Sequence, residues 1–170
     1  MNKSGKKDYT QLILLVILLS FLAIIDIATL YIWKSTSSPV ISSSGTETIT
    51  VAEIISGDTI ILDNGKTVRL LGINAPDENQ PYYQESIDML KFLILDKKVR
   101  LEKDAVEDDG SGNLLRYVYV EYNREELFVN KESVSQGYSL PLNLAPNTKH
   151  KSEIDAARQE CIKDKIRICA

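Results

Sequence analysis

The chain has 170 residues, with 20 lysines and arginines against 24 aspartates and glutamates, and a formal net charge of −4. The excess of acid is larger beyond Lys34, where 16 basic and 22 acidic residues give a net charge of −6. Non-specific affinity for nucleic acid comes from Lys and Arg side chains that neutralise phosphates. The composition therefore excludes a domain that holds nucleic acid by bulk charge alone, and a bound cation would have to help.

An almost wholly apolar stretch at residues 12–33 begins close to the start of the chain. As a helix rising 1.5 Å per residue, it is long enough to cross the hydrocarbon layer of a membrane. Three lysines precede it and only Lys34 follows soon after, which favours a cytoplasmic N-terminus. We predict a cytoplasmic segment at 1–11, a transmembrane signal-anchor helix at 12–33 and an extracytoplasmic domain, in a single-pass protein of the cell membrane.

Two other interpretations of this stretch are weaker. A cleaved signal peptide has a shorter apolar core and a small-residue cleavage site, and no such site lies between Ala28 and Ser44. A buried helix of a soluble domain fits the length less well. Asp26 lies inside the span and is costly in lipid, so it is either a tolerated single acid or a group that is protonated or paired by self-association.

Residues 34–48 are rich in Ser and Thr and lack hydrophobic periodicity, so we predict a flexible linker. The remaining residues, 49–170, suffice for one domain with one core. Within it, two apolar runs at 60–62 and 68–73 are joined by a segment that contains Asn64-Gly65. Asn-Gly between such runs is a strong hairpin signal, because both residues tolerate positive φ.

Polar side chains stand at the ends of this predicted hairpin. Asp58 precedes its first strand, Arg69 lies within its second, and Asn74 and Asp77 follow the second. Because the second strand returns toward the start of the first, we expect these side chains to meet. Oxygen ligands beside a guanidinium suit a hard divalent cation and a phosphate.

The rest of the domain alternates short strands and helices. Periodicity predicts further strands at 51–55, 99–103 and 115–121, and helices at 80–95, 129–136 and 152–163. Gly137 suits the C-terminal end of the second helix. Five short strands with helices indicate a small closed β-barrel.

The motifs along residues 49–170 resemble those of the staphylococcal nuclease (thermonuclease) family. Gly57-Asp58-Thr59 is followed by V-R-L-L-G-I-N-A-P-D at residues 68–77, and the likeness continues downstream in the same order through residues 97–102, 114–120 and 127–137. The resemblance implies an α+β fold, a five-stranded OB-fold barrel with three helices, here preceded by the one predicted transmembrane helix.

The resemblance also implies roles for individual residues. Asp58, Asn74 and the backbone carbonyl of Ala75 occupy the positions that hold Ca²⁺ in family members. Asp77 occupies the position of the general base that activates the attacking water. Arg69 and Asn113 occupy the positions of two arginines that bind the phosphate and stabilise its developing charge.

Three of these positions depart from the family pattern. Asn74 offers an oxygen but removes a negative charge, so metal affinity should fall. Asp77 is one methylene shorter than the usual Glu, a retreat of roughly 1.5 Å from the water it must reach. Asn113 brings no charge, and Arg116 should face the other side of its strand. Each departure lowers the expected rate.

Two function hypotheses follow. The first is a membrane-anchored, Ca²⁺-dependent nuclease that hydrolyses phosphodiester bonds in single-stranded DNA or RNA, with reduced activity. The alternative is a catalytically degenerate barrel that serves as a nucleic-acid or protein binding module at the membrane. Retention of Asp58, Arg69 and an acid at position 77 favours the enzyme, whereas Asn74 and Asn113 favour the binding module.

Two further expectations concern the C-terminal region. Cys161 and Cys169 would be about 12 Å apart within one continuous helix, too far for a disulfide, but a chain that turns back after Lys163 could join them. His150, the only histidine, lies in a polar segment and is expected to be solvated.

Overall fold

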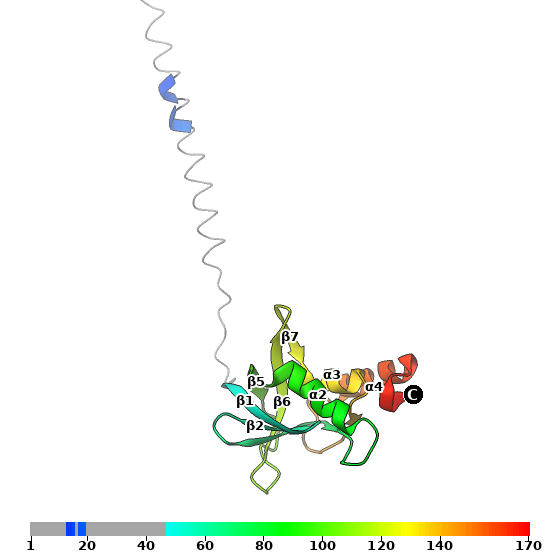
Figure 1. Cartoon of the computed structure of the whole chain (residues 1–170). Helices are drawn as coiled ribbons and strands as arrows, with labels where there is room; N and C mark the ends of the chain where they lie inside the picture. Colours follow the sequence, from blue (N-terminus) through cyan, green and yellow to red (C-terminus); the bar gives the residue numbers. More distant parts are fainter. Residues whose placement is uncertain (1–12, 16, 20–46) are drawn as a thin grey trace, which may run out of the picture. The chain divides into compact units, whose positions relative to one another are not determined.

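The computed structural model describes residues 13–15, 17–19 and 47–170, and residues 45–170 form one compact unit (Figure 1). Most of the predicted transmembrane helix lies outside the described residues, and so does the predicted linker apart from residues 47 and 48, which belong to the first strand. Within the described ranges, no helix is long and apolar enough to cross a membrane. The boundaries predicted at 1–11, 12–33 and 34–48 stay predictions.

Five strands close into a barrel. They are β1 (Glu47–Ser56), β2 (Thr59–Leu62), β3 (Thr67–Leu70), β5 (Lys98–Glu102) and β6 (Leu114–Tyr122). Their order is β3-β2-β1-β5-β6, and a parallel pairing of β3 with β6 closes the circle. The predicted five-stranded closed barrel is confirmed.

The β2–β3 hairpin forms where the Asn-Gly pair predicts it. Gly65 has a φ of 79°, and the backbone N–H of Lys66 donates to Asn64 Oδ1 over 3.1 Å. Residues alternate along both strands, so that Ile60 and Val68 point into the core. Arg69 has the opposite orientation and is carried on the outer side of the barrel wall.

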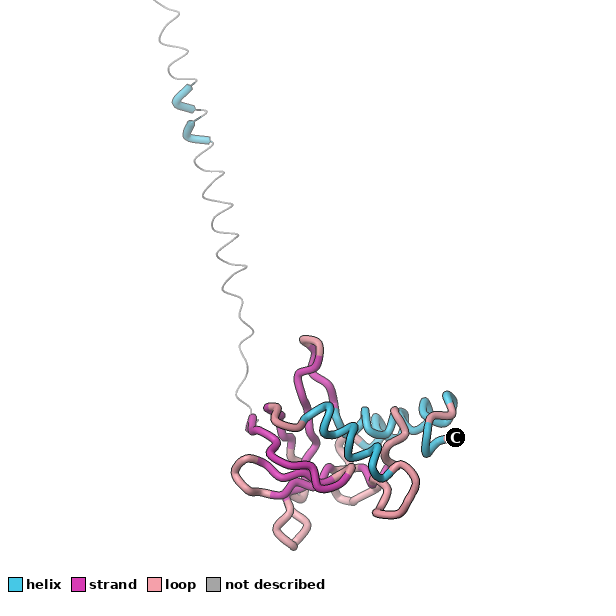
Figure 2. Tube along the Cα trace, in the orientation of Figure 1, coloured by secondary structure: helices cyan, strands magenta, loops and turns pink. Residues whose placement is uncertain are grey.

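Three helices pack around the barrel, as predicted: α2 (Tyr83–Ile94), α3 (Val129–Ser135) and α4 (Lys151–Asp164). Figure 2 shows the strands gathered on one side, with α3, α4 and the C-terminus on the other. The predicted apolar stripe of α2 is buried at Ile87, Leu90 and Ile94. The helix begins at Tyr83 instead of Gln80, because Tyr82 has a left-handed φ of 69°.

A buried asparagine joins α3 to the barrel. Asn130 is fully buried; its Oδ1 accepts from the Val118 N–H over 2.9 Å, and its Nδ2 donates to the Leu71 carbonyl over 2.8 Å. A buried amide whose oxygen and nitrogen both form hydrogen bonds fixes the geometry of the groups that it joins. The backbone leaving β3, which carries the residues after Leu71, is thereby held in place.

The structure contains short elements that the sequence pattern did not predict. Strand β7 (Glu125–Phe128) pairs with the end of β6, strands β4 (Ile73–Asn74) and β8 (Leu140–Pro141) pair with each other, and a 3-10 helix, η1, spans Arg167–Cys169. Two-residue strands are too short to show alternation, and the two glutamates at the start of β7 conceal it.

The expectation that His150 is solvated is wrong. Its side chain is 19% exposed, and its ring lies 4.6 Å from the Tyr117 ring and 5.0 Å from the Phe128 ring, centroid to centroid. Its Nε2 lies 3.1 Å from Tyr119 Oη and 3.4 Å from Glu102 Oε1. The aromatic rings come from β6 and β7. The sequence pattern did not predict this packing, because it did not predict β7.

Cys161 and Cys169 form a disulfide, with Cα atoms 5.7 Å apart. Helix α4 ends at Asp164, Lys165 adopts a left-handed φ of 52°, and the chain folds back as η1. Arg167 then donates to the Gln136 carbonyl over 2.9 Å and stacks over the Tyr138 ring. The disulfide therefore fastens the C-terminus to α4 beside the end of α3.

Candidate active site

Asp58 lies in the turn between β1 and β2 and is only 3% exposed. Its Oδ1 accepts hydrogen bonds from Ser56 Oγ (2.9 Å), Thr59 Oγ1 (3.0 Å) and Arg69 Nη1 (2.9 Å). Its Oδ2 accepts from the Ala75 N–H over 2.8 Å. A buried carboxylate must be paired and hydrogen-bonded, and these four donors meet that need.

The turn before Asp58 requires a glycine. A Cβ on Gly57 would lie 2.3 Å from Ser86 Oγ and 2.7 Å from Ala75 Cβ. Helix α2 and the segment after β4 therefore approach the turn so closely that only a residue without a side chain fits. This close approach places the Asp58 carboxylate against the backbone of Ala75.

Arg69 joins the two halves of the site. Its Nη1 pairs with Asp58 Oδ1, and its Nη2 donates to Asn74 Oδ1 over 3.0 Å. The Asn74 Nδ2 in turn lies 3.3 Å from the Ala75 carbonyl oxygen. The structure thus brings together four of the residues singled out in the sequence, Asp58, Arg69, Asn74 and Ala75.

The oxygens of this cluster suit one cation. A carboxylate, an amide oxygen and a backbone carbonyl form an all-oxygen donor set of the kind that Ca²⁺ prefers. The guanidinium of Arg69 already spans the Asp58 and Asn74 oxygens and acts as a stand-in for a cation between them. The donor set fits calcium but holds a single formal negative charge. Among the described residues, no group of three or more His, Cys, Asp or Glu side chains is placed to hold a metal.

Asp77 lies in the loop between β4 and α2 and is exposed. Its backbone N–H donates to Gln80 Oε1 over 2.9 Å, and its carbonyl accepts from the Gln80 N–H over 2.9 Å. Within the part of the chain that the structure describes, no side chain is hydrogen-bonded to its carboxylate. The Asp77 carboxylate is therefore open to solvent two residues beyond Ala75.

Asn113 precedes β6, and its amide is engaged within its own loop. Its Nδ2 donates to Asp109 Oδ2 over 2.7 Å, and its backbone N–H donates to Asp109 Oδ1 over 3.1 Å. The hydrogen bond from the Asn113 side chain is the main cause that lowers the pKa of Asp109. Arg116, 6% exposed, donates instead to the Glu107 and Leu115 carbonyls, on the side away from the site as expected.

A groove of about 490 Å³ opens beside Arg69. Its polar lining includes Thr59, Arg69, Asp109 and Asn113, and its apolar lining comes largely from the loop after β8, with Leu142, Leu144 and Pro146. A groove with an apolar wall and a few convergent polar groups is a typical binding site for a small molecule or a nucleotide.

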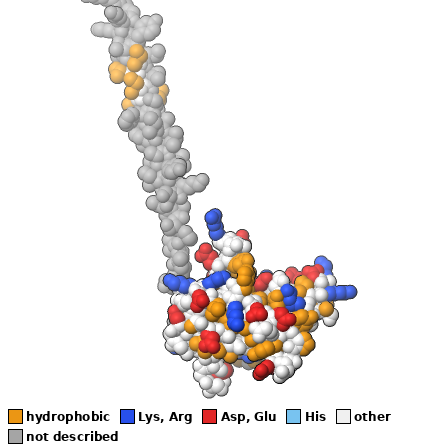
Figure 3. Space-filling model, viewed as in Figure 1, with side chains coloured by type: hydrophobic (Ala, Val, Ile, Leu, Met, Phe, Trp, Pro, Cys, Tyr) orange, Lys and Arg blue, Asp and Glu red, His pale blue; other side chains and the backbone are white. Residues whose placement is uncertain are grey.

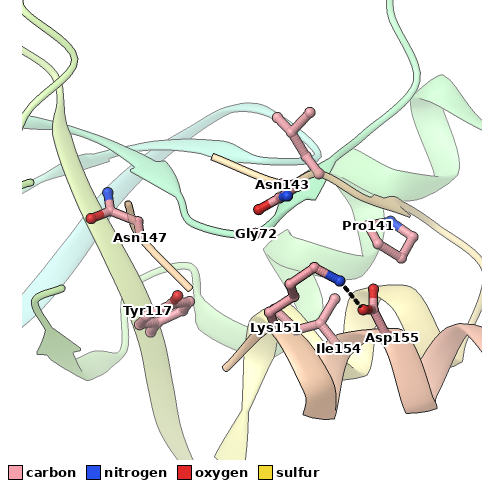
Figure 4. Close-up of a pocket in the computed structure, with 9 residues that line it drawn as sticks. Gly72, Tyr117, Pro141, Asn143, Asn147, Lys151, Ile154 and Asp155 are labelled. Atoms are coloured by element: carbon pink, nitrogen blue, oxygen red, sulfur yellow. Dashed lines mark hydrogen bonds and ion pairs between the residues drawn. The ribbon is translucent and has the colours of Figure 1, made fainter. Parts of the chain in front are cut away.

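A second pocket is much smaller. It lies between Gly72, Tyr117, Asn143 and the first turns of α4, where Lys151 and Asp155 form an ion pair (Figure 4). Its volume of about 100 Å³ corresponds to roughly three water molecules. A nucleotide does not fit there, so the groove beside Arg69 is the better substrate site.

Comparison with known proteins shows to which family the chain belongs. Residues 67–169 match the model of the family described as "Staphylococcal nuclease homologue". The thermonuclease of Staphylococcus hyicus is 33% identical over 137 residues, which cover 75% of this chain and 79% of that protein. This chain belongs to the staphylococcal nuclease family. The thermonuclease of Staphylococcus intermedius is 30% identical over 131 residues (72% and 76%), and an uncharacterized endonuclease of Escherichia coli is 38% identical over 72 residues (41% and 46%).

Asp58 precedes the segment that the staphylococcal nuclease model matches, so its assignment rests on geometry. It is hydrogen-bonded to Arg69 and Ala75, and both lie inside the matched segment. The roles of Asp58, Asn74, Ala75, Asp77, Arg69 and Asn113 stay predictions, whereas the proximity of the first three to Arg69 is a feature of the structure.

Some site residues were missed at the level of sequence. Ser56 and Thr59 flank Asp58 and donate their hydroxyls to it, but two hydroxyls near a turn give no specific signal. The leucines of the groove wall, Leu142 and Leu144, were also missed. Their alternation around Asn143 is the one pattern that could have placed them on a common face.

Proposed function

We propose that this protein is a membrane-anchored, Ca²⁺-dependent nuclease that hydrolyses phosphodiester bonds in single-stranded DNA or RNA. The observation that carries the proposal is the cluster of Asp58, Arg69 and Asn74 at the edge of a groove of nucleotide size. The thermonuclease relatives support a nucleic-acid substrate.

Each residue has a defined part in the proposed reaction. Asp58, Asn74 and the Ala75 carbonyl hold Ca²⁺, which when bound neutralises negative charge near the scissile phosphate. Asp77 accepts a proton from a water whose oxygen attacks phosphorus. Arg69 donates to the phosphate oxygens, and the bond from phosphorus to the leaving oxygen breaks as that oxygen gains a proton from solvent.

Charge explains why a metal would be required. Lys, Arg, Asp and Glu side chains are intermingled over the visible face of the domain (Figure 3). Beyond Lys34 the chain carries a net charge of −6. Phosphate affinity then depends on local charge at the site, where Arg69 and a bound cation would supply it.

Three sequence features support anchoring in the membrane. Residues 12–33 are apolar, lysines precede them, and no small-residue cleavage site follows. The Cys161–Cys169 disulfide is consistent with an extracytoplasmic domain, because disulfides persist in oxidising compartments. Asp26 would provide a contact for self-association in the membrane.

A second candidate function is binding without cleavage. Asn113 favours it, because this uncharged residue occupies the position of the second phosphate-binding arginine and its amide donates to Asp109. In this candidate the barrel holds a nucleic acid or a protein at the membrane and cuts nothing.

Labelled single-stranded DNA and RNA distinguish the two candidates. The full-length chain and its Asp77→Ala variant are mixed with each oligonucleotide in calcium, and binding and cleavage are measured in parallel. A nuclease cuts, and the variant loses cutting while it keeps binding, because Asp77 is exposed and supports no other side chain. Equal binding by both proteins with no product from either would refute the nuclease and support the binding module.

A further inference from the structure

The oxygens that would hold a cation are all engaged by hydrogen-bond donors of the protein. Asp58 Oδ1 accepts from two hydroxyls and from Arg69, Asn74 Oδ1 accepts from Arg69, and the Ala75 carbonyl accepts from the Asn74 amide. A carboxylate has about four lone-pair positions on its two oxygens. Oδ1 accepts three hydrogen bonds and therefore has no position left for a cation while Arg69 remains, whereas Oδ2 accepts only from the Ala75 N–H and has one position left.

We propose that Arg69 and Ca²⁺ compete for the oxygens of Asp58 and Asn74, so that entry of the metal releases the guanidinium into the groove. The competition itself is independent of the proposed function. Its consequence for phosphate binding rests on that function.

Arg69 is the donor best able to leave. Ser56 and Thr59 lie within two residues of Asp58, so the turn itself holds their hydroxyls beside the carboxylate. Arg69 reaches Asp58 from the neighbouring strand, its side chain is 30% exposed, and it already lines the groove. A rotation of its long side chain breaks both hydrogen bonds without any change in the backbone.

The amide at position 74 makes the competition strong. The cluster contains one formal negative charge, on Asp58, and a guanidinium already pairs with it at 2.9 Å. Two cations cannot share one carboxylate without a large cost, because like charges a few ångströms apart repel. A second carboxylate at this position would let the metal and the guanidinium bind together.

The released guanidinium would lie in the groove. There the oxygens of a phosphodiester can accept hydrogen bonds from its two parallel N–H groups. Calcium would therefore favour phosphate binding, and by linkage a phosphodiester would favour calcium binding by the same factor. The metal and the phosphate clamp would then assemble more readily when substrate is present than in its absence.

Calcium titrations of the full-length chain by calorimetry, without nucleic acid, test the exchange. Arg69→Lys keeps the positive charge but cannot span two oxygens, and Lys66→Gln removes a charge from the same hairpin without touching Asp58 or Asn74. We expect Arg69→Lys to lower the calcium Kd about fivefold or more, within the usual range of coupling between sites. Lys66→Gln should change the Kd less than about twofold, as expected for a screened surface charge. Equal values for wild type and Arg69→Lys would overturn the proposal.

A measurement on the wild-type chain avoids any loss of stability in the Arg69 variant. Dimethyl phosphate is a small phosphodiester anion that resists hydrolysis, and at saturating concentration it should lower the calcium Kd severalfold in wild type. In Asn74→Asp the calcium Kd should be lower from the start, and dimethyl phosphate should change it less. No effect of dimethyl phosphate on wild type would contradict the coupling.

The outcomes separate this inference from the proposed function. A chain that shows the exchange but cuts no nucleic acid refutes the nuclease and leaves the competition standing. A chain that cuts with calcium while wild type and Arg69→Lys bind the metal equally refutes the competition alone.

Discussion

Asn113 lines the groove beside Arg69 but is uncharged. Its amide donates to Asp109, so this donor is already engaged and is not directed at a bound phosphate. A single donor aimed at developing charge commonly contributes a factor of about 100 or more to a rate. If the proposed nuclease activity holds, we attribute its low expected rate mainly to this residue.

Asn113→Arg should raise the rate of DNA cleavage in calcium by roughly tenfold or more, because it adds a charged donor to the groove. Asn143→Arg is the matched control, since it adds the same charge at an exposed asparagine outside that groove. Initial rates on one labelled oligonucleotide measure both. Equal gains in the two variants would show that added charge, and not its position, governs the rate.

The core of the site could be predicted from sequence because its residues lie on one hairpin and the segment that follows. The return of β3 toward the start of β2 pairs Arg69 with Thr59, the residue after Asp58. The groove wall could not be predicted, because it depends on how the loop after β8 packs against the barrel. A tertiary contact of this kind leaves no periodic pattern in the sequence.

At the scale of elements, the Glu102 side chain at the end of β5 contacts Lys149 and His150, which immediately precede α4. Burial alone would raise the pKa of this carboxyl, but hydrogen bonds from Lys149, Tyr119 and His150 outweigh burial and hold the pKa at about 2. A carboxyl whose pKa is lower in the folded state than in the unfolded chain stabilises the fold fully at pH values above its unfolded pKa. That contribution is lost as the pH falls from about 4.5 toward 2.

Glu102→Gln should lower the free energy of unfolding near pH 7 by up to about 3 kcal/mol, the value that corresponds to such a shift. The difference from wild type should shrink as the pH falls toward 2. Thermal unfolding followed across that range measures it, with Glu160→Gln, exposed on α4, as the control. A difference that stays constant with pH would contradict this role for the Glu102 charge.

The Cys161–Cys169 disulfide stabilises the C-terminal turn. Closing a loop of this length restricts the unfolded chain by about 2–3 kcal/mol in the chain-entropy model. Reduction, or Cys169→Ser, should therefore speed hydrogen exchange at Ile166 and Ile168, whose N–H groups donate to the Cys161 and Gly137 carbonyls. Exchange that is unchanged by reductant in wild type would show that the turn holds without the disulfide.

The elements themselves were largely predictable. All five barrel strands and all three helices follow from periodicity and from the Asn-Gly turn, and only their ends differ by a few residues. The environment of His150 could not be predicted from the sequence pattern. Its polar neighbours in sequence indicated solvent, while its ring packs against Tyr117 and Phe128 from strands distant in the chain.

At the scale of the whole molecule, we propose that residues 12–33 are a membrane anchor and that residues 49–170 are the catalytic domain. We expect the full-length chain to sediment with membranes and to resist extraction by high salt, because apolar burial in lipid does not depend on ionic strength. A variant that lacks residues 1–44 should remain in the supernatant. Fractionation followed by detection of the domain measures both, and an identical distribution would contradict the anchor.

We propose that the cluster around Asp58 is a calcium-dependent catalytic site. The most direct test is the rate at which the chain cuts single-stranded DNA as calcium is titrated and then removed by a chelator. We predict a rate that rises with calcium, falls to background with chelator, and is absent in Asp58→Ala at every calcium concentration. Cleavage that persists in chelator, or that Asp58→Ala retains in full, would refute a calcium-dependent catalytic role for this cluster.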